Sequence, residues 1–256
     1  MSKKIGLYPE ILFHFTDRLG LFGILESNFK VSYARERIEG LDLIKSFGVP
    51  MVSFCDLRLS ELKTHIDNYR DYGIGLSKDW ANKNGLNPVM YMNSKCPSTD
   101  LFLKSVEDIY NKLENDNSNS SYNEKVIAYM GILNMFRYMK NYEGTLIRPN
   151  KWPKQNYRFA NEREWRFVPP LATDIPAFVP IDDINTSKKK QVLNQKISHI
   201  QLFFEPEDIK YLIVKEDSER LELLDHLEHV KRHFNPSVRR RLASRILTVE
   251  QIKYDV

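Results

Sequence analysis

Two glutamates, Glu162 and Glu164, stand two residues apart in the segment Glu-Arg-Glu-Trp-Arg, residues 162–166. On a β-strand, side chains at positions i and i+2 point to the same face, so these carboxylates are expected to be neighbours. Within a cleft, their mutual repulsion would raise the pKa of one carboxyl while the other stays ionised. That arrangement suits acid–base catalysis or the stabilisation of an oxocarbenium ion. On an exposed edge strand, the same groups would only form ion pairs with nearby lysines or arginines.

His14 is a second candidate, because it ends an apolar segment directly before a predicted helix. Thr16 is placed to cap that helix, so an imidazole and a hydroxyl would stand beside free backbone N–H groups. This combination suits the binding of a ribose, an amide or a phosphate. The alternative is that His14 is a core histidine whose hydrogen bonds are satisfied inside the protein.

Other reactive side chains point less clearly to chemistry. Ser53 and Cys55 end a further predicted strand, and His65 lies on the helix that follows. A Cys55 nucleophile lacks an identifiable oxyanion donor and third orienting group, and a Ser53, Asp56 and His65 triad lacks the Gly-x-Ser-x-Gly turn, so the pattern does not favour a hydrolase. His226 and His229 share one helix face, but the many charges of that helix favour a solvated surface over a metal site. We therefore expect no metal.

A basic run opens the C-terminal segment 231–256, where residues 231–245 include six lysines and arginines and no acidic residue. Such a run can bind the phosphates of nucleic acid, pair with an acidic partner, or stay solvated. The residues that would contact nucleic acid are Lys231, Arg232, Arg239, Arg240 and Arg241.

The composition predicts one domain over residues 1–256. With 42% hydrophobic and 12% aromatic residues, a chain of 256 residues can bury a sizeable core. The balance of 38 lysines and arginines against 34 acidic residues is only mildly basic, and does not by itself call for nucleic acid. The two cysteines fit a reducing compartment, and no apolar run approaches the roughly 18 to 20 residues of a membrane helix. We expect a cytoplasmic protein with no membrane contact.

The order of predicted elements favours an α+β fold, with a mixed or antiparallel central sheet flanked by helices, because strands and helices do not alternate strictly. An exposed polar loop at about 114–123 separates two helical segments. Predicted strands cover 49–55, 72–77, 87–93, 157–168, 199–204 and 209–214, with helices capped by Thr16 and Ser60, a helix over 78–84 that ends at Gly85, and another over 218–233.

Several short motifs, taken in order, resemble the bacterial AbiGi family. They are His-Phe-Thr near the start, PMVSFCDL, YGIGLSKDWA, NPVMY, the segment 162–166 and a closing LTVEQI. Arg58 departs from the proline expected after the Asp-Leu pair, which puts only the local turn in doubt. The family is known as the antitoxin partner in a two-gene abortive-infection system. The resemblance therefore implies a role in phage defence and a cognate toxin, of nucleotidyltransferase-like type, as partner.

More distantly, the layout looks like that of DNA-targeting ADP-ribosyltransferases of the DarT type. That resemblance implies an ADP-ribosyltransferase-like fold and an NAD-binding cleft, although the arginine that such enzymes use has no clear counterpart. It implies either a regulatory antitoxin built on this fold or an active NAD-dependent mono-ADP-ribosyltransferase modifying nucleic acid or protein. The implied NAD contacts are His14 and Thr16, the catalytic carboxylate is Glu164 supported by Glu162, and Tyr33, Ser53 and Tyr72 line the cleft.

Overall fold

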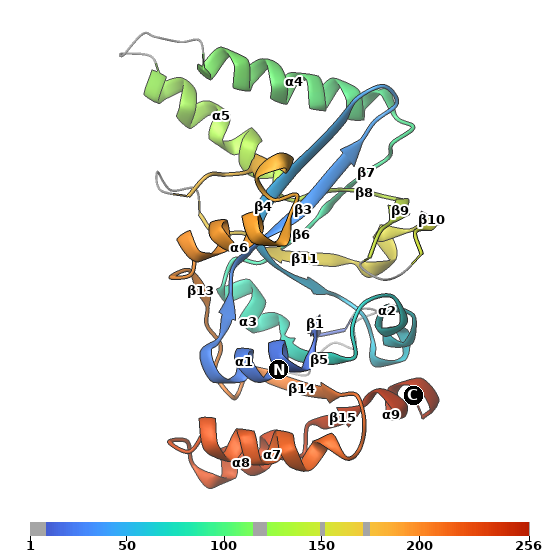
Figure 1. Ribbon diagram of the computed structural model, residues 1–256, viewed down its shortest axis with the longest axis vertical. Coiled ribbons are helices and arrows are strands. Elements are labelled where there is room, and N and C mark those ends of the chain that lie inside the picture. The colour runs from blue at the N-terminus through green and yellow to red at the C-terminus, as the bar shows by residue number, and fades with distance from the viewer. Residues whose placement is uncertain (1–8, 115–121, 149–151, 171–174, 256) are drawn as a thin grey trace, which may run out of the picture.

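A mixed central sheet organises the computed structural model, which describes residues 9–114, 122–148, 152–170 and 175–255 (Figure 1). Among the described strands of this sheet, only β14 and β15 pair in parallel. In order, the strands are β15 (Ile246–Thr248), β14 (Ile209–Val214), β5 (Tyr72–Ser77), β1 (Ile11–Thr16), β4 (Ile44–Cys55), β11 (Glu164–Phe167) and β6 (Asn87–Pro88), while β3 (Ser32–Glu39) and β12 (Val179–Pro180) also pair with β4.

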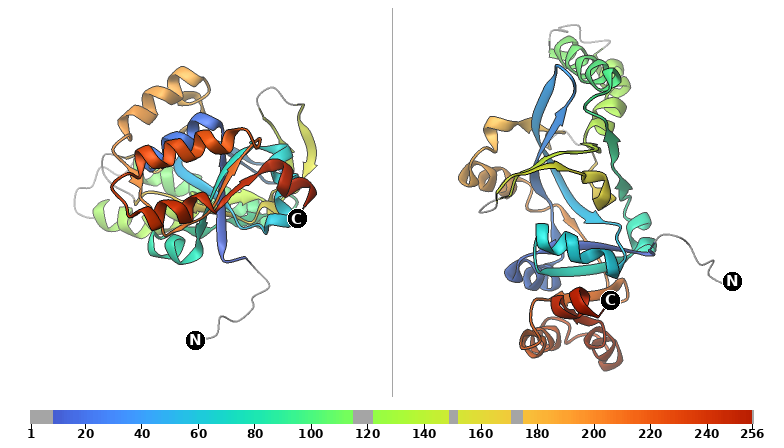
Figure 2. Two further views of the ribbon diagram at one scale, coloured as in Figure 1. Left: turned by 90° about the horizontal axis from the view of Figure 1, so that it is seen from below. Right: turned by 90° about the vertical axis from the view of Figure 1, so that its right-hand side faces the viewer.

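The helices gather at the two ends and along the sides of the sheet, which confirms the predicted α+β class. Figure 2 shows α4 and α5 at one end of the long axis, and α7, α8 and α9 at the other. Not one of the described helices has the length and apolar character needed to cross a membrane. The helices are α1 (Arg18–Ser27), α2 (Leu62–Asn68), α3 (Lys78–Lys83), α4 (Pro97–Glu114), α5 (Tyr122–Phe136), α6 (Ser187–Lys196), α7 (Glu219–Val230), α8 (Pro236–Ala243) and α9 (Val249–Tyr254).

Strand β4 is the longest strand of the sheet and changes partners along its length. Its first eight residues pair with β3, and its last four pair with β11. Its final residue, Cys55, also lies opposite Phe13 of β1. The predicted strand over 49–55 is thus confirmed and begins earlier, at Ile44. Aspartate Asp100 of α4 holds the turn between β3 and β4, because its carboxylate accepts backbone N–H groups of residues 41–43.

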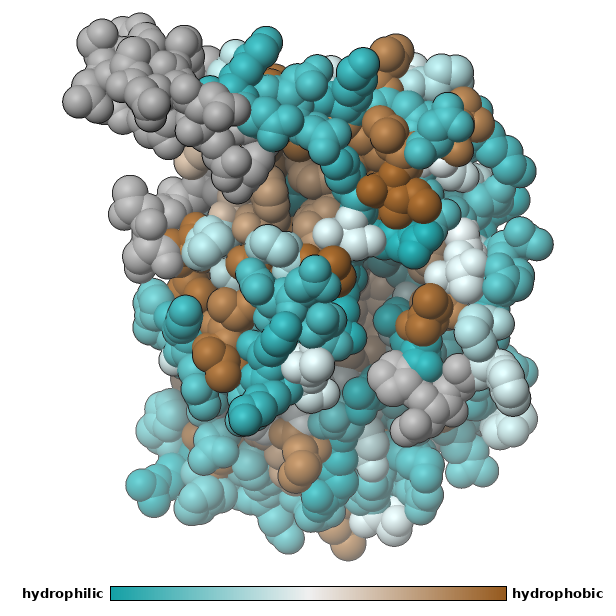
Figure 3. Space-filling model, turned by 45° about the horizontal axis from the view of Figure 1, so that its top comes forward, coloured by the Kyte–Doolittle hydropathy of each residue, from teal (hydrophilic) through white to brown (hydrophobic). Residues whose placement is uncertain are grey.

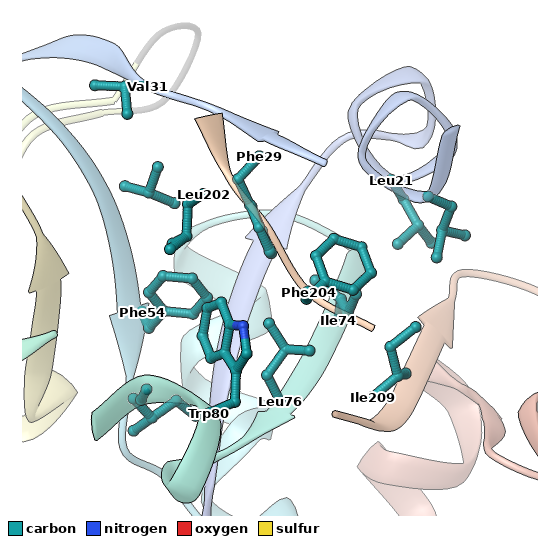
Figure 4. Packing of buried hydrophobic residues seen from close by; sticks show 14 of the residues in the cluster. Leu21, Phe29, Val31, Phe54, Ile74, Leu76, Trp80, Leu202, Phe204 and Ile209 are labelled. Atoms are coloured by element: carbon teal, nitrogen blue, oxygen red, sulfur yellow. The ribbon is translucent and has the colours of Figure 1, made fainter. Parts of the chain in front are cut away.

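The main core lies against the sheet and is rich in aromatic rings. Phe29, Phe54, Trp80 and Phe204 pack edge to face or at a tilt (Figure 4). The indole N–H of Trp80 donates to the backbone carbonyl of Phe203 at 2.8 Å, so its polar atom is satisfied inside the core. This core fixes the positions of β1, β4 and β5, of which β1 and β4 carry part of the site described below.

Local caps differ from those predicted. Asp17, not Thr16, caps α1, and its carboxylate accepts the Gly20 N–H at 2.9 Å. A 3₁₀ turn over Leu59–Glu61 precedes α2, with Arg58 rather than Ser60 at its N-cap position. Helix α3 does end before Gly85, whose φ of 69° lies in the left-handed region that glycine adopts freely.

Three predicted strands are interrupted. Residues 157–168 contain the end of β10 (Lys154–Tyr157), a 3₁₀ turn over Phe159–Glu162, and β11. The left-handed conformation of Arg163, with φ 46°, separates the turn from β11. Residues 87–93 split into β6 and β7 (Met90–Met92), and within 199–204 only β13 (Gln201–Leu202) is a strand. The remaining paired strands are β2 (Phe29–Lys30) with β13, β8 (Met139–Asn141) with β7, and β9 (Gly144–Leu146) with β10.

The predictions for the polar loop at 114–123 and for the basic segment 231–256 compare differently with the structure. Helices α4 and α5 flank the predicted loop at 114–123 as expected, and residues 115–121 of that loop lie outside the described residues. The basic segment 231–256 is part of the fold, because it supplies α8, β15 and α9.

Candidate functional site

A cavity of about 900 Å³ opens where β4 changes partners. Its walls come from β1, β3, β4, the 3₁₀ turn before β11, and helix α6. Figure 1 shows α6 on one side of β3 and β4 and the β9–β10 hairpin on the other, and Figure 3 shows the surface hollowed near the middle of this face. The polar and charged residues that line it are His14, Arg35, Glu36, Ser53, His65, Tyr69, Arg70, Lys140, Arg148, Glu162, Glu164, Ser187, Lys190, Gln191, Asn194, Gln195 and Ser198.

The cavity brings together four of the seven predicted site residues, namely His14, Ser53, Glu162 and Glu164. Thr16 lines an adjacent cavity of about 360 Å³, which shares His14 and Ser53 with the larger one. Tyr33 and Tyr72 line neither. Tyr33 is buried in the core with 1% of its surface exposed, and the Tyr72 hydroxyl donates to Glu219 of α7.

Glu162 and Glu164 converge, but not in the predicted way. Glu162 ends a 3₁₀ turn and Glu164 begins β11, so the two do not share a strand face. Both side chains nevertheless reach the ammonium of Lys140, which lies 2.6 Å from Glu164 and 3.5 Å from Glu162. Both glutamates are buried, at 5% and 6% exposure, so the alternative of an exposed, solvated pair is wrong.

Two cations hold Glu164 ionised. Arg166 Nε lies 2.7 Å from one carboxylate oxygen, and Lys140 Nζ lies 2.6 Å from the other. Burial alone would raise the pKa of Glu164, but the charges of Arg166 and Lys140 outweigh it and lower that pKa to about 2. Glu164 is therefore the carboxyl of the pair that stays ionised. Arg166 is itself fully buried, and its guanidinium also approaches Glu36 at 3.1 Å.

His14 is fixed as a neutral imidazole. Its Nδ1 lies 2.8 Å from the carbonyl oxygen of Ser53, and because a carbonyl only accepts, Nδ1 carries the proton. Burial lowers the pKa of His14, so the ring stays uncharged and Nε2 is left as an acceptor. The rings of Phe29 and Phe54 pack against it, with centroids 5.3 and 5.6 Å away.

Planar groups stack along another wall. The rings of His65 and Tyr69 lie parallel, with centroids 4.3 Å apart, and the Arg148 guanidinium lies 4.0 Å from the Tyr69 ring centre. Burial and the charges of Arg148 and Lys140 lower the pKa of His65 to about 3, so this ring is also neutral. The Tyr69 hydroxyl donates to Glu162, which joins the stack to the charged cluster.

Comparison with known proteins places the chain in a family. A family model described as "Putative abortive phage resistance protein AbiGi, antitoxin" matches residues 24–215, most of the chain. The chain belongs to this AbiGi family. It is similar to "Abortive phage resistance protein AbiGi" of Lactococcus lactis subsp. cremoris, with 26% identity over 252 residues that cover 89% of this chain and 99% of that protein. The two matches place the chain among the proteins of abortive phage resistance.

No solved structure matches this AbiGi chain, so the likeness to ADP-ribosyltransferases rests on sequence motifs alone. The span matched by the AbiGi model contains Ser53, Glu162 and Glu164, and begins after His14 and Thr16. It also ends before α7, α8 and α9.

The five basic residues of this AbiGi chain that were predicted to contact nucleic acid do not line the cavity, and lie on and around α8. Arg239 pairs with Glu228 at 2.6 Å, and Arg241 lies 4.0 Å from Glu207. The Lys231 ammonium lies 5.7 Å from the ring centre of Phe204. Arg232 and Arg240 are exposed. Binding of nucleic acid by this segment stays a prediction.

Among the described residues of the AbiGi chain, no group of three or more histidines, cysteines, aspartates or glutamates is placed to hold a metal ion. Burial raises the pKa of the Cys55 thiol, which keeps it protonated and unreactive. The cavity residues that the motifs did not reveal are Arg35, Tyr69, Lys140, Arg148 and the inner face of α6.

Proposed function

We propose that this chain works in the bacterial cytoplasm as the antitoxin or regulatory partner of a phage-defence toxin, and that a nucleotide bound in its cavity controls this action. The family description supports the antitoxin role. The observation that supports nucleotide binding is that His14, Ser53 and Glu164 line one and the same cavity. Its volume, about 900 Å³, lies within the usual range of ligand pockets.

The chemistry of the walls suits a nucleoside. The free Nε2 of neutral His14 can accept a hydrogen bond from a ribose hydroxyl. Glu162 offers a further acceptor, and the stacked rings of His65 and Tyr69 lie in the same cavity. NAD is the nucleotide that the resemblance to DarT-type enzymes implies, and it is the first ligand to test.

The second candidate function is an active NAD-dependent mono-ADP-ribosyltransferase that modifies nucleic acid or protein. It is favoured by the position of Glu164, which lines the same cavity as His14 and has Glu162 close by. Against it, both oxygens of Glu164 are already engaged by Lys140 and Arg166. Because these cations neutralise the carboxylate, they weaken its attraction for a developing oxocarbenium ion. We therefore favour ligand-dependent regulation over catalysis.

Calorimetric titration with NAD tests the cavity. We expect the wild-type protein to bind NAD and the His14→Ala variant to lose this binding. His226→Ala is the matched control, because His226 hydrogen-bonds the carbonyl of Phe22 and does not line the cavity. Equal binding by all three proteins would place NAD elsewhere, and no binding by the wild-type protein would remove NAD as the ligand.

Co-expression with the toxin tests the partnership. We expect the product of the neighbouring gene, predicted to be nucleotidyltransferase-like, to co-purify with this chain and to arrest growth when expressed alone. If the chain is instead an active transferase, labelled NAD should mark a protein or nucleic acid, and Glu162→Gln should reduce that labelling. A chain that neither rescues growth nor co-purifies with the toxin would contradict the antitoxin role.

A further inference from the structure

Helix α6 turns a wholly polar face to the cavity. The cavity-lining residues of the helix are Ser187, Lys190, Gln191, Asn194 and Gln195. Their spacing of three and four places them on one side of the helix. No residue of α6 is fully buried, and Leu193 is its one side chain that packs against the main core, whereas a helix that merely covers a core presents a whole apolar stripe to it. The inner face of α6 therefore serves the cavity rather than the core.

Two cations at this wall have no partner of opposite charge among the residues that the structure describes. Lys190 of α6 and Arg35 of β3 both line the cavity, and within the described parts of the chain no carboxylate pairs with either. Arg35 is held in place by its Nε, which donates to the carbonyl oxygen of Ile184 at 2.7 Å. Burial, and then the charge of Arg35, lowers the pKa of Lys190, as expected for like charges brought together without a counter-ion.

On the opposite wall of the cavity, the charged groups already have partners of opposite charge. Its carboxylates, Glu162 and Glu164, are matched by Lys140 and Arg166 before any ligand arrives. An anionic group entering the cavity is thus repelled little by the carboxylates and attracted to the unmatched cations beside α6. Phosphate groups also accept hydrogen bonds, which the side chains of Ser187 and Gln191 can donate.

We propose that the inner face of α6, together with Arg35, is the phosphate-binding subsite of the cavity, and that the ligand is a nucleotide carrying a diphosphate. This inference rests on the proposed nucleotide-binding function and deepens it. The diphosphate lies along α6 near Lys190 and Arg35, and the ribose lies toward His14. The nucleotide thereby bridges α6 and the central sheet.

The run of three lysines, Lys188, Lys189 and Lys190, supplies a matched test, because only Lys190 lines the cavity. Calorimetric titrations with NAD and with inorganic pyrophosphate compare the wild-type protein with Lys190→Ala, Lys190→Arg and Lys188→Ala. We expect Lys190→Ala to weaken NAD binding about tenfold, the loss of one charge-assisted hydrogen bond, and to abolish binding of pyrophosphate. Lys190→Arg should keep much of the affinity, and Lys188→Ala all of it.

A second pair of variants tests whether Arg35 contributes to binding of the phosphates. Arg35→Ala should weaken both ligands, whereas Arg37→Ala should not, because Arg37 pairs with Glu39 and does not line the cavity. Thermal melts will show whether each variant keeps its fold, and alanine is well tolerated at helix position 190.

The outcomes separate the two proposals. If NAD binds equally well to the wild-type protein, Lys190→Ala and Arg35→Ala, the phosphate subsite is wrong and the nucleotide cavity stands. If pyrophosphate binds and depends on Lys190 while NAD does not bind, the anion subsite stands and NAD is wrong as the ligand. If the wild-type protein binds neither, both proposals fall.

Discussion

The ammonium of Lys140 lies 2.6 Å from the carboxylate of Glu164, in a wall of the cavity to which both side chains contribute. Lys140 comes from β8 and Glu164 from β11, and Arg166 occupies the second carboxylate oxygen. Because these groups are nearly withdrawn from water, their attraction is weakly screened. The cluster ties two strands together and compensates the charge of Glu164 in the absence of ligand.

Removing the charge of Glu164 should therefore destabilise the fold. Glu164→Gln removes the nearer counter-ion of two buried cations, and leaves Lys140 only Glu162 at 3.5 Å and Arg166 only Glu36 at 3.1 Å. The expected loss in free energy of unfolding is about 3 kcal/mol, the lower end of the cost of breaking a buried ion pair. Glu107→Gln is the control, because Glu107 is exposed, its partner Lys45 is only half-buried, and such pairs contribute at most about 1 kcal/mol. Urea denaturation measures both. An unfolding midpoint for Glu164→Gln equal to that of the wild-type protein would show that the cluster contributes nothing to stability.

His65 should make the protein sensitive to mild acid. Its pKa is about 3 in the fold and 6.5 ordinarily, so between these values the unfolded chain takes up a proton that the native protein excludes. Stability is full above pH 6.5 and falls as the pH drops towards 3, by up to about 1.4 kcal/mol per pH unit. His65→Phe keeps a ring beside Tyr69 and should flatten this slope. Identical slopes in urea denaturation from pH 7 to pH 4 would contradict the prediction.

Asn194 should anchor α6 to the sheet. Its side-chain oxygen accepts the backbone N–H of Tyr33 at 2.9 Å, and Tyr33 is buried. Asn194→Ala leaves that N–H without a partner, which costs about 1 to 3 kcal/mol. Asn185→Ala removes only an exposed contact of 3.4 Å and should change stability little. Chemical denaturation of the two variants gives the comparison, and equal losses would show that the Asn194 bond is not an anchor.

The cap of α1 can be tested directly. Asp17→Ala removes the acceptor of the Gly20 N–H and should cost about 1 kcal/mol. Thr16→Val, at the position where the sequence predicts the cap, should cost less, because Thr16 belongs to β1. Thermal unfolding of both variants decides between the two assignments. A larger loss for Thr16→Val would favour the predicted cap.

Much of the fold follows from local patterns in the sequence. The strand 72–77, the helix that ends at Gly85, the helices on both sides of 114–123 and the strand 209–214 occur as predicted. In each, periodicity and a terminating residue agree. The break at Arg163 could not be foreseen, because a left-handed arginine depends on its contacts with Asp56 and Glu61 rather than on its own preference.

The candidate site was predictable only where its residues belong to motifs. His14, Ser53, Glu162 and Glu164 meet in one cavity, whereas Tyr33 and Tyr72 lie elsewhere. The sequence did not indicate that Lys140 and Arg35 belong to the site, because single basic residues in polar segments are common on solvated surfaces. Lys190 stands in a run of three lysines that indicates an exposed helix, and only the placement of α6 distinguishes it from Lys188. Long-range packing, which local patterns do not encode, supplies these partners.

The parallel pairing of β14 with β15 has a consequence for synthesis. Among the described residues, only 246–248 pair with the outer edge of β14, so the sheet cannot be completed until translation has passed residue 248. At 5 to 20 residues per second, the 34 residues between the end of β14 at Val214 and the end of β15 at Thr248 take roughly 2 to 7 seconds. Until then, the nascent chain carries an unpaired strand edge, which is a template for aggregation. The ribosome must therefore translate residues 215–248 before the protein can close this edge of its sheet, and pauses within that stretch would lengthen the interval in which the chain needs a chaperone.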